Sequence, residues 1–396
     1  GKATATMAKA MEEILKDKIT RGLISVKYGH TADLEKIEYI EAGHPVPDEN
    51  GFNAGKKILD IAKNADKNTL VITLISGGGS ALLTHPYVYD NEEKIEIRLE
   101  DMQDTTNRLL KCGAIINEIN CLRKHLSAIK GGKLAKALYP AKSINLILSD
   151  VVGDRLDTIA SGPTSPDDTT FEEMDRIIKK YEIRDNLPRN VLKILEKGLK
   201  GDVEETPKEK DKIFKNTNNI LIGTNYQSLQ ACANKASSLG YNSLIISSQI
   251  VGEAKDVAKV LAGIAKDSKK HDLLGDKPLC IIAGGETTVT LTGEGKGGRN
   301  QEIALSYLAE IEKEMDSFEN IYFISASTDG NDGPTDAAGA YADIELFERS
   351  KEKDLSIDDY LKNNDSYHFF EEIDGLVKTG PTNTNVCDIH LILIEN

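Results

Sequence analysis

The sequence has 396 residues and a formal net charge of -15, because 64 Asp and Glu outnumber 49 Lys and Arg. This acidic balance excludes a general nucleic-acid binder, which needs a basic face to neutralise phosphates, but it is compatible with a local basic pocket for a small anion. No apolar run approaches the roughly 20 residues that cross a bilayer, so we expect no membrane partner.

Short apolar runs alternate with amphipathic stretches along most of the chain. The runs predict strands at residues 70–76, 143–149, 220–223, 242–247, 279–284, 321–327 and 388–394. The stretches predict helices at residues 52–63, 101–110, 226–239, 254–264 and 300–314. Such alternation gives parallel sheets covered by helices on both faces, with ligands bound at the carboxyl ends of strands. We therefore expect an α/β fold.

The best candidate for a domain boundary is the charged segment 201–215, which contains a proline and has no apolar face. It predicts two domains, residues 1–212 and 213–396, with a cleft between them. A long surface excursion within one domain has the same pattern.

The first motif that suggests chemistry is a glycine-rich loop directly after the strand at 70–76. Its residues are Ser76, Gly77, Gly78, Gly79 and Ser80. Consecutive glycines let backbone N–H groups approach a phosphate or carboxylate closely. The loop is neither a Walker A motif nor a GxGxxG fingerprint. A flexible turn is the alternative.

A basic segment, residues 120–133, stands out in the acidic chain. Arg123 can bind a carboxylate or phosphate at two points, and Lys130 precedes two glycines that allow a tight turn. A solvated helical face is the alternative, and His125 reads equally well as a structural imidazole.

Carboxylates follow two predicted strands. Asp150 comes directly after the strand at 143–149, where α/β enzymes place a metal ligand or a base, whereas Asp157 fits turn formation. Asp329 and Asp332 follow the strand at 321–327, where an acidic turn can hold Mg²⁺ through one carboxylate and waters. Turn-forming Asp-Gly pairs are the alternative there.

Residues 284–302 predict a hairpin that leads into a helix. Arg299 at the helix start can stabilise charge on a transferring phosphoryl group, helped by the helix N-terminus. Gly298 and Asn300 flank it as candidates for phosphate binding, with Asn300 as a plain helix cap in the alternative. Glu286 either orients this loop or contributes to a metal site.

Five scattered cysteines form no CxxC pair, which argues against a disulfide framework or a zinc site. Reduced thiols fit better, and no signal peptide opens the sequence. We therefore expect a cytoplasmic protein.

Taken together and in order, the motifs resemble those of the class II glycerate kinases, the glycerate 2-kinase family with a C-terminal MOFRL domain. The resemblance covers nearly the whole chain and is carried by GKA at the start, SGGGSALL, NCLRKHLSAIKGGKLA, LSDVVGDRLDTIASGPTSPD, GGETTVTLTGEGKGGRNQE, TDGNDGPTDAAGA and GPTNTNV. It implies an N-terminal Rossmann-like domain and a smaller C-terminal α/β domain. It also implies transfer of phosphate from ATP to the 2-hydroxyl of D-glycerate with Mg²⁺ or a similar ion, by a monomer or homodimer.

In family terms, Lys2 and Arg299 match the basic residues proposed for catalysis. Asp150 and Asp329 are then the candidates to orient or deprotonate the hydroxyl, and the glycine loop and Arg123 bind phosphate or carboxylate. Two departures stand out. The family has a strand leading into the Gly-Lys-Ala motif, whereas this sequence starts at Gly1, which predicts either a missing leading segment or a frayed Lys2. Asn383 replaces a glycine, and asparagine tolerates left-handed backbone geometry.

Two other functions compete with the kinase. Relatives have been labelled hydroxypyruvate reductases, but such an oxidoreductase needs a dinucleotide fingerprint that this sequence lacks. A metabolite-binding protein without catalysis is the other alternative, against which Lys2 and Arg299 both speak.

Overall fold

In the computed structural model, which describes residues 1–91 and 93–396, the chain forms two compact α/β units. Unit 1 comprises residues 1–149 and 154–222, and unit 2 comprises residues 150–153 and 223–396. The division after residue 222 comes later than the boundary at 212/213 that we expected, because the charged segment 201–215 packs within unit 1. There Val203 and Ile213 are buried, and the Glu205 carboxylate accepts the Phe171 N–H at 2.7 Å.

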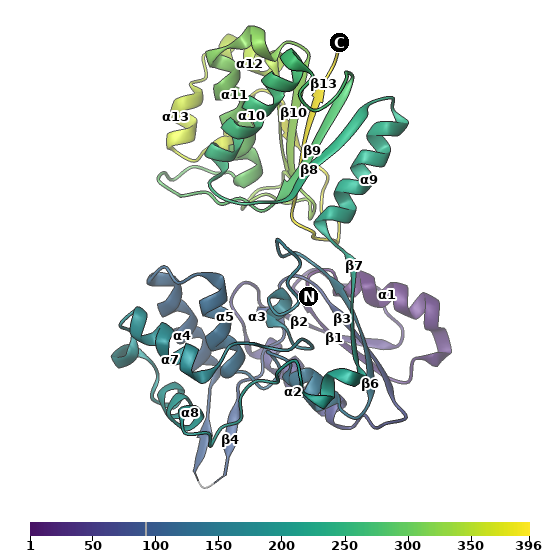
Figure 1. Ribbon diagram of the computed structural model, residues 1–396, viewed down its shortest axis with the longest axis vertical. Helices are drawn as coiled ribbons and strands as arrows, with labels where there is room; N and C mark the ends of the chain where they lie inside the picture. Colours follow the sequence, from purple (N-terminus) through teal and green to yellow (C-terminus); the bar gives the residue numbers. More distant parts are fainter. Residues whose placement is uncertain (92) are drawn as a thin grey trace. The chain divides into compact units, whose positions relative to one another are not determined.

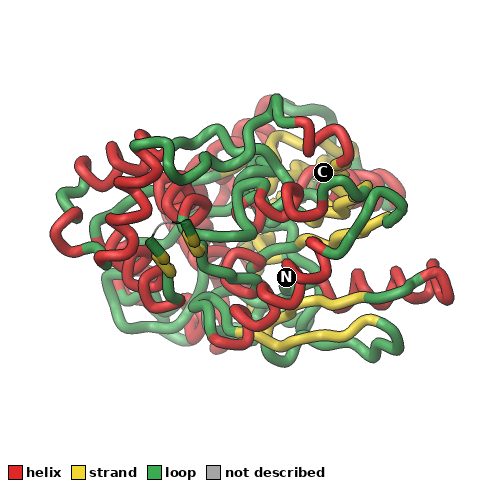
Figure 2. The backbone as a smooth tube through the Cα atoms, turned by 90° about the horizontal axis from the view of Figure 1, so that it is seen from below, coloured by secondary structure: helices red, strands yellow, loops and turns green. Residues whose placement is uncertain are grey.

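Unit 1 is built on parallel strands (Figure 1). β1 (Gly22–Lys27) pairs with β2 (Ile37–Ala42), and β3 (Leu70–Ile75) pairs with β6 (Lys142–Leu148). β7 (Thr217–Gly223) lies beside β6. A short antiparallel hairpin, β4 (Val88–Asp90) with β5 (Lys94–Glu96), stands apart from the parallel strands (Figure 2). The carboxyl end of β3 therefore opens onto the glycine loop, as the sequence predicts.

Helices surround these strands. Their bounds are α1 (Thr4–Leu15), α2 (Glu49–Lys63), α3 (Gly79–Leu82), α4 (Leu99–Lys111), α5 (Ile116–His125), α6 (Lys133–Leu138), α7 (Phe171–Lys180) and α8 (Arg189–Leu199). α2 begins before the predicted residue 52 because the Asp48 side chain accepts the Gly51 N–H at 2.9 Å and caps the helix. Apolar faces of α4, α5, α7 and α8 close one core of the unit.

A cavity of about 550 Å³ separates β1 from β3 in unit 1. Within the described residues, β1 pairs only with β2 and β3 only with β6, so the two edges that face the cavity are unpaired. Its lining is mostly apolar and includes Ile58, Leu74 and Leu134. Such a lining does not suit a phosphate, so the anion site has to be sought at the strand ends instead.

Unit 2 contains a six-stranded sheet in the order β12-β11-β10-β13-β9-β8. The bounds are β8 (Asn242–Ile250), β9 (Leu279–Gly285), β10 (Ile321–Ser327), β11 (Gly339–Ala342), β12 (Leu376–Val377) and β13 (Asp388–Ile394). β8 and β9 are parallel, but the other neighbouring pairs are antiparallel. Our expectation of parallel sheets is therefore wrong for this unit, since an apolar run predicts a strand but not its direction.

The sheet of unit 2 lies between α9 (Asn225–Ser238) on one face and α10 (Ala254–His271) and α11 (Arg299–Lys313) on the other (Figure 1). The remaining helices are α12 (Ile344–Glu352), α13 (Ile357–Lys362) and α14 (Ser366–Glu372). α11 is buried along most of its first three turns, because helices and sheet both pack on it. This central position fixes Arg299, its first residue.

The hairpin predicted at 284–302 does not form. Residues 286–298 follow an irregular path whose backbone is held by the segment 363–365. The N–H groups of Thr292 and Gly293 donate to the Asn364 side chain at 2.7 and 3.0 Å, and the Gly295 N–H donates to the Asn363 carbonyl at 2.8 Å. These bonds replace the cross-strand ladder that a hairpin would need.

In the described part of the chain, every helix is too short or too polar to cross a membrane.

Candidate functional site

The glycine loop after β3 offers backbone donors rather than serine hydroxyls. Ser76 is buried, and its Oγ accepts the Ala3 N–H at 3.1 Å; Ser80 Oγ lies 2.7 Å from Ser161 Oγ. Both hydroxyls, which we expected to bind substrate, therefore have partners within the protein. Among the described residues, the N–H groups of Gly77 and Gly78 have no acceptor. These two amides are therefore available to donate to an anion.

Lys2 is held against this loop and is not frayed. Its N–H donates to the Gly77 carbonyl at 2.8 Å, and the Gly1 amino group donates to the Ser25 carbonyl at 2.7 Å. A Cβ on Gly78, which has a φ of 79°, would lie 3.3 Å from Lys2 Cγ. The Lys2 side chain forms no ion pair with any described residue. It is thus a positioned cation without a counter-ion.

The basic segment contributes two more cations to unit 1. Arg123 is partly buried on α5 and makes no ion pair within the described residues, and burial lowers its pKa. Lys130 is buried and donates to the Leu83 carbonyl at 2.9 Å. Burial, followed by the charge of Arg123, lowers the pKa of Lys130 to about 7. A bound anion would stabilise the charged form of both side chains.

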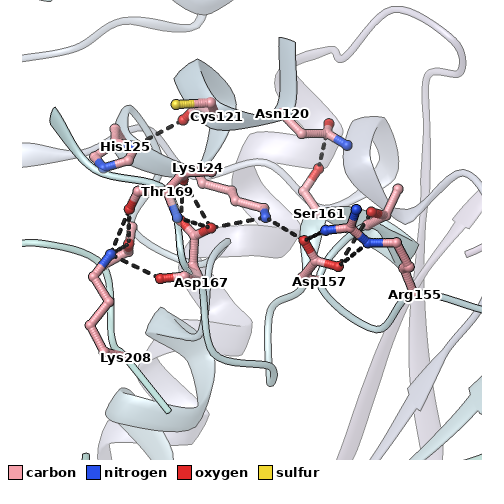
Figure 3. A network of polar contacts seen from close by, with 12 residues as sticks. Asn120, Cys121, Lys124, His125, Arg155, Asp157, Ser161, Asp167, Thr169 and Lys208 are labelled. Atoms are coloured by element: carbon pink, nitrogen blue, oxygen red, sulfur yellow. Dashed lines mark hydrogen bonds and ion pairs between the residues drawn. The ribbon is translucent and has the colours of Figure 1, made fainter. Parts of the chain in front are cut away.

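Other residues of this segment are structural. Lys124 bridges Asp167 at 3.1 Å and Asp157 at 3.4 Å, and its side chain and that of Asp167 are almost fully buried (Figure 3). His125 contacts the Cys121 carbonyl at 2.8 Å through Nδ1 and the Glu205 carboxylate at 3.0 Å through Nε2. The structural alternative is therefore confirmed for His125.

In unit 2, Arg299 is clamped by two carboxylates. Nε and Nη2 donate to the fully buried carboxylate of Asp388 at 2.6 and 3.0 Å, and Nη1 donates to Glu286 at 2.7 Å. Burial lowers the pKa of Arg299, but its bonds to Asp388 outweigh this effect and the net direction is upward. Glu286 thus contacts the arginine, whereas the two roles that we predicted for it, orienting the loop and contributing to a metal site, stay predictions.

The Asp332 and Asn300 side chains hydrogen-bond to groups of unit 2 around the start of α11. Both oxygens of the buried Asp332 carboxylate accept backbone N–H groups at the start of α11, from Asn300 at 3.1 Å and from Gln301 at 2.9 Å. The Asn300 side chain accepts from Ser325 Oγ at 2.7 Å. A Cβ on Gly298 would lie 2.4 Å from the Asp332 carboxyl carbon, so this glycine permits the close packing. Asp332 and Asn300, which we predicted as a metal ligand and a phosphate ligand, thus already have hydrogen-bond partners within the protein. Their roles as ligands stay predictions.

Our predicted metal ligands do not form a preformed site. The described residues contain no group of three His, Cys, Asp or Glu side chains placed to hold an ion. Asp329 Oδ1 accepts from Ser327 Oγ and from the Asn331 N–H, each at 2.9 Å, which is the turn-forming role. Its other oxygen has no partner among the described residues.

Asp150, directly after β6, belongs to unit 2 together with Arg299. Burial raises the pKa of the Cys387 thiol, and the charges of Glu286, Asp150 and Asp388 raise it further. Asp150 therefore shares the electrostatic surroundings of the arginine clamp.

We missed two basic residues at the carboxyl ends of strands: Lys27, the last residue of β1, and His44, shortly after β2. The His44 ring packs against Gly78, where a Cβ would lie 3.0 Å from its Cδ2. The rule that ligands bind beyond strand carboxyl ends could have found both.

Known families match both parts of the chain. Residues 1–196 match the model of a domain of unknown function, DUF4147, and residues 279–388 match that of the MOFRL family. A glycerate 2-kinase of Pyrococcus horikoshii is 44% identical over 397 residues, which cover 100% of this chain and 86% of that protein. A protein of Agrobacterium vitis named as a hydroxypyruvate reductase is 40% identical, with 100% and 86% covered.

The crystal structure of a glycerate kinase from Thermotoga maritima is also similar, with a TM-score of 0.88 and 40% identity. The match covers 100% of this chain and 90% of that one. Full-length identity at this level, both family models and the same fold leave one assignment. The chain belongs to the class II glycerate kinases, the family that carries a MOFRL domain.

Proposed function

We propose that the protein transfers a phosphoryl group from ATP to the 2-hydroxyl of D-glycerate, giving 2-phosphoglycerate and ADP. The observation that carries this proposal is Lys2, which has no counter-ion among the described residues and lies beside the Gly77 and Gly78 amides. Phosphoryl transfer needs little covalent chemistry from a protein but much positioning and charge neutralisation. Relatives named glycerate 2-kinase support the acceptor and the choice of hydroxyl.

In this proposal, unit 1 binds negative charge. The Gly77 and Gly78 amides and Lys2 receive a phosphate or the glycerate carboxylate, and Arg123 binds a second anionic group with Lys130 behind it. In unit 2, the clamped Arg299 stabilises charge on the transferring group. Asp150 is our candidate to orient or deprotonate the hydroxyl, because it lies in the same charged surroundings as Arg299.

Magnesium fits this scheme only as an ion brought with ATP. The described residues offer no group of three ligands, and Mg²⁺ commonly takes most of its ligands from phosphates and water with one or two carboxylates. We propose that the Asp329 carboxylate is one of the Mg²⁺ ligands, through the oxygen that has no partner among the described residues. Bound there, the ion would neutralise phosphate charge.

The test is product identity after mixing the protein with D-glycerate, ATP and Mg²⁺. Phosphorus NMR distinguishes 2-phosphoglycerate from 3-phosphoglycerate and shows ADP in the same spectrum. We expect 2-phosphoglycerate and ADP in equal amounts. 3-Phosphoglycerate would correct the regiochemistry. The absence of both phosphoglycerates would refute the kinase.

Reduction of hydroxypyruvate is the second candidate, because the Agrobacterium vitis relative has that name. The loop after β3 has the sequence SGGGS, which lacks the dinucleotide fingerprint. NADH consumption with hydroxypyruvate, monitored at equal enzyme concentration, separates the two activities. We also propose a cytoplasmic monomer or homodimer, in line with the free cysteines among the described residues.

A further inference from the structure

His44 lies beside the proposed anion-binding loop although no role has been given to it. A Cβ on Gly78 would lie 3.3 Å from His44 Nε2 and also 3.3 Å from Lys2 Cγ. The imidazole edge that carries Nε2 and the Lys2 side chain therefore flank the same glycine. Neither His44 nor Lys2 has a hydrogen-bonded or ionic side-chain partner among the described residues.

The surroundings of His44 come from the carboxyl ends of three strands. Lys27 ends β1, His44 follows β2, and Gly78 follows β3. Lys27 also makes no ion pair within the described part of the chain. Parallel strands of α/β proteins bind their ligands at these ends.

The charged groups around the imidazole are mostly positive. Burial lowers the pKa of His44 to about 4, and the charges of Lys2, Lys27 and His30 are among those that contribute to this lowering. The imidazole is therefore neutral near pH 7, with cations on several sides.

The nearby carboxylates are already engaged. Asp48 accepts the Gly51 N–H at 2.9 Å and the Tyr28 hydroxyl at 2.8 Å, and Glu41 accepts the Gly29 N–H at 2.7 Å. These bonds leave both carboxylates charged, but the charges that act most strongly on the His44 imidazole are positive. An anion placed there would favour protonation of the imidazole.

We propose that an anionic group of the substrate, a carboxylate or a phosphate, binds between His44, Lys2 and the Gly77–Gly78 amides, and that His44 takes up a proton as it binds. The identity of the substrate rests on the proposed function, whereas the anion site does not. His44 then donates a charge-assisted hydrogen bond to the anion.

Calorimetry in two buffers of different ionisation enthalpy measures the proton uptake directly. The titrants are D-glycerate, ADP and inorganic phosphate, each added to the wild-type protein at pH 5.5. This pH is chosen because Lys130 is then already protonated, so that it contributes no uptake. We expect uptake approaching one proton per bound anion. The count for phosphate and ADP is corrected for protons that these ligands lose on binding, because their second pKa lies near 6. After this correction, uptake with D-glycerate alone identifies a carboxylate site, and uptake only with phosphate or ADP identifies a phosphate site. Binding without uptake by all three overturns the proposal.

The variant His44→Gln keeps hydrogen-bonding capacity but cannot become charged. We expect it to abolish the uptake and to raise the KM of the substrate that binds there about 10- to 100-fold, with a smaller change in kcat. His85→Gln is the matched control, since His85 is also in unit 1 with a pKa lowered by burial but lies among Lys63, Asp60 and Lys56. Unchanged uptake or an unchanged KM in His44→Gln contradicts the assignment.

Two further readouts keep the inference separable from folding and from the kinase. If His44→Gln fails to fold, NMR of the wild-type protein replaces it, because the imidazole resonances report protonation of His44 when the anion is added. Resonances that do not change on addition of the anion overturn the proposal. If no phosphoglycerate forms but anions bind with proton uptake lost in His44→Gln, the site stands and only the proposed function falls.

Discussion

The candidate site residues of the two units differ in how their basic side chains are paired. In unit 2, Arg299 donates to both oxygens of the buried Asp388 and to Glu286. In unit 1, Lys2, Lys27 and Arg123 make no ion pair with any described residue. A paired arginine is fixed in place and keeps its charge, whereas an unpaired cation gains most when an anion arrives.

This contrast separates two kinds of contribution to catalysis. The arginine clamp of unit 2 is stable without a ligand, so its removal should damage the fold and the chemistry together. Lys2, Lys27 and Arg123 of unit 1 pair with no described residue, so their removal should damage function alone. Each prediction below tests one side of this difference.

Arg299→Ala should have the largest effect. In the proposed function it removes charge stabilisation of the transferring group, which predicts a fall in kcat of at least about 10²- to 10³-fold. From the sequence alone we would expect an intact fold, but the variant leaves the buried Asp388 carboxylate unpaired, which costs about 3–5 kcal/mol of unfolding free energy. Urea unfolding and steady-state kinetics measure the two effects.

The double variant Arg299→Ala with Asp388→Asn is its control. It should recover part of the lost stability, because no buried charge remains, without recovering activity. If the single variant is as stable as the wild type, the clamp is not a structural cluster and the contrast fails.

Lys2→Met should have a similar kinetic effect without the structural one. We expect kcat/KM to fall about 10²- to 10³-fold and the unfolding free energy to change by no more than about 0.5 kcal/mol, because no partner is lost. Lys9→Met, at an exposed position on α1, is the matched control and should change neither. A large loss of stability in Lys2→Met would show that Lys2 is structural after all.

Lys130→Met should change the pH dependence of stability. The pKa of Lys130 is about 7 in the folded protein and near 10.4 when unfolded, so between these values the unfolded chain binds one more proton. Wild-type stability therefore gains about 1.4 kcal/mol per pH unit from this lysine as pH rises above 7, and the variant lacks this gain. Urea unfolding at pH 7, 8 and 9 should show the advantage of the variant shrinking with pH; parallel curves would mean that Lys130 stays charged in the folded protein.

The sequence predicted the position of most elements, because apolar periodicity and glycine-bounded runs reflect local chemistry. It did not predict strand direction in unit 2, nor that residues 286–298 are held by the segment 363–365, since those outcomes depend on partners far along the chain. The same limit applies to the site. The glycine loop and Arg299 were recognisable from local pattern, but the contacts of Asp332 with the N–H groups of α11 and of Asn300 with Ser325 appear only once α11 meets its neighbours.

Asn383 should give the smallest effect and tests backbone tolerance in unit 2. Its φ is 59°, as expected for an asparagine in place of the family's glycine. The preceding residue, Thr382, donates its N–H to the Asp329 carbonyl at 3.2 Å. Asn383→Gly relieves the positive φ but makes the unfolded chain more flexible, so we expect a change within about 1 kcal/mol. Valine does not tolerate this backbone geometry, because a β-branched residue is strained at this φ. We therefore expect Asn383→Val to lower the free energy of unfolding by about 1–2 kcal/mol more than Asn383→Gly does. Thermal and urea unfolding of the three proteins decide the order, and equal stability of the valine variant would show that the turn relaxes away from the left-handed region.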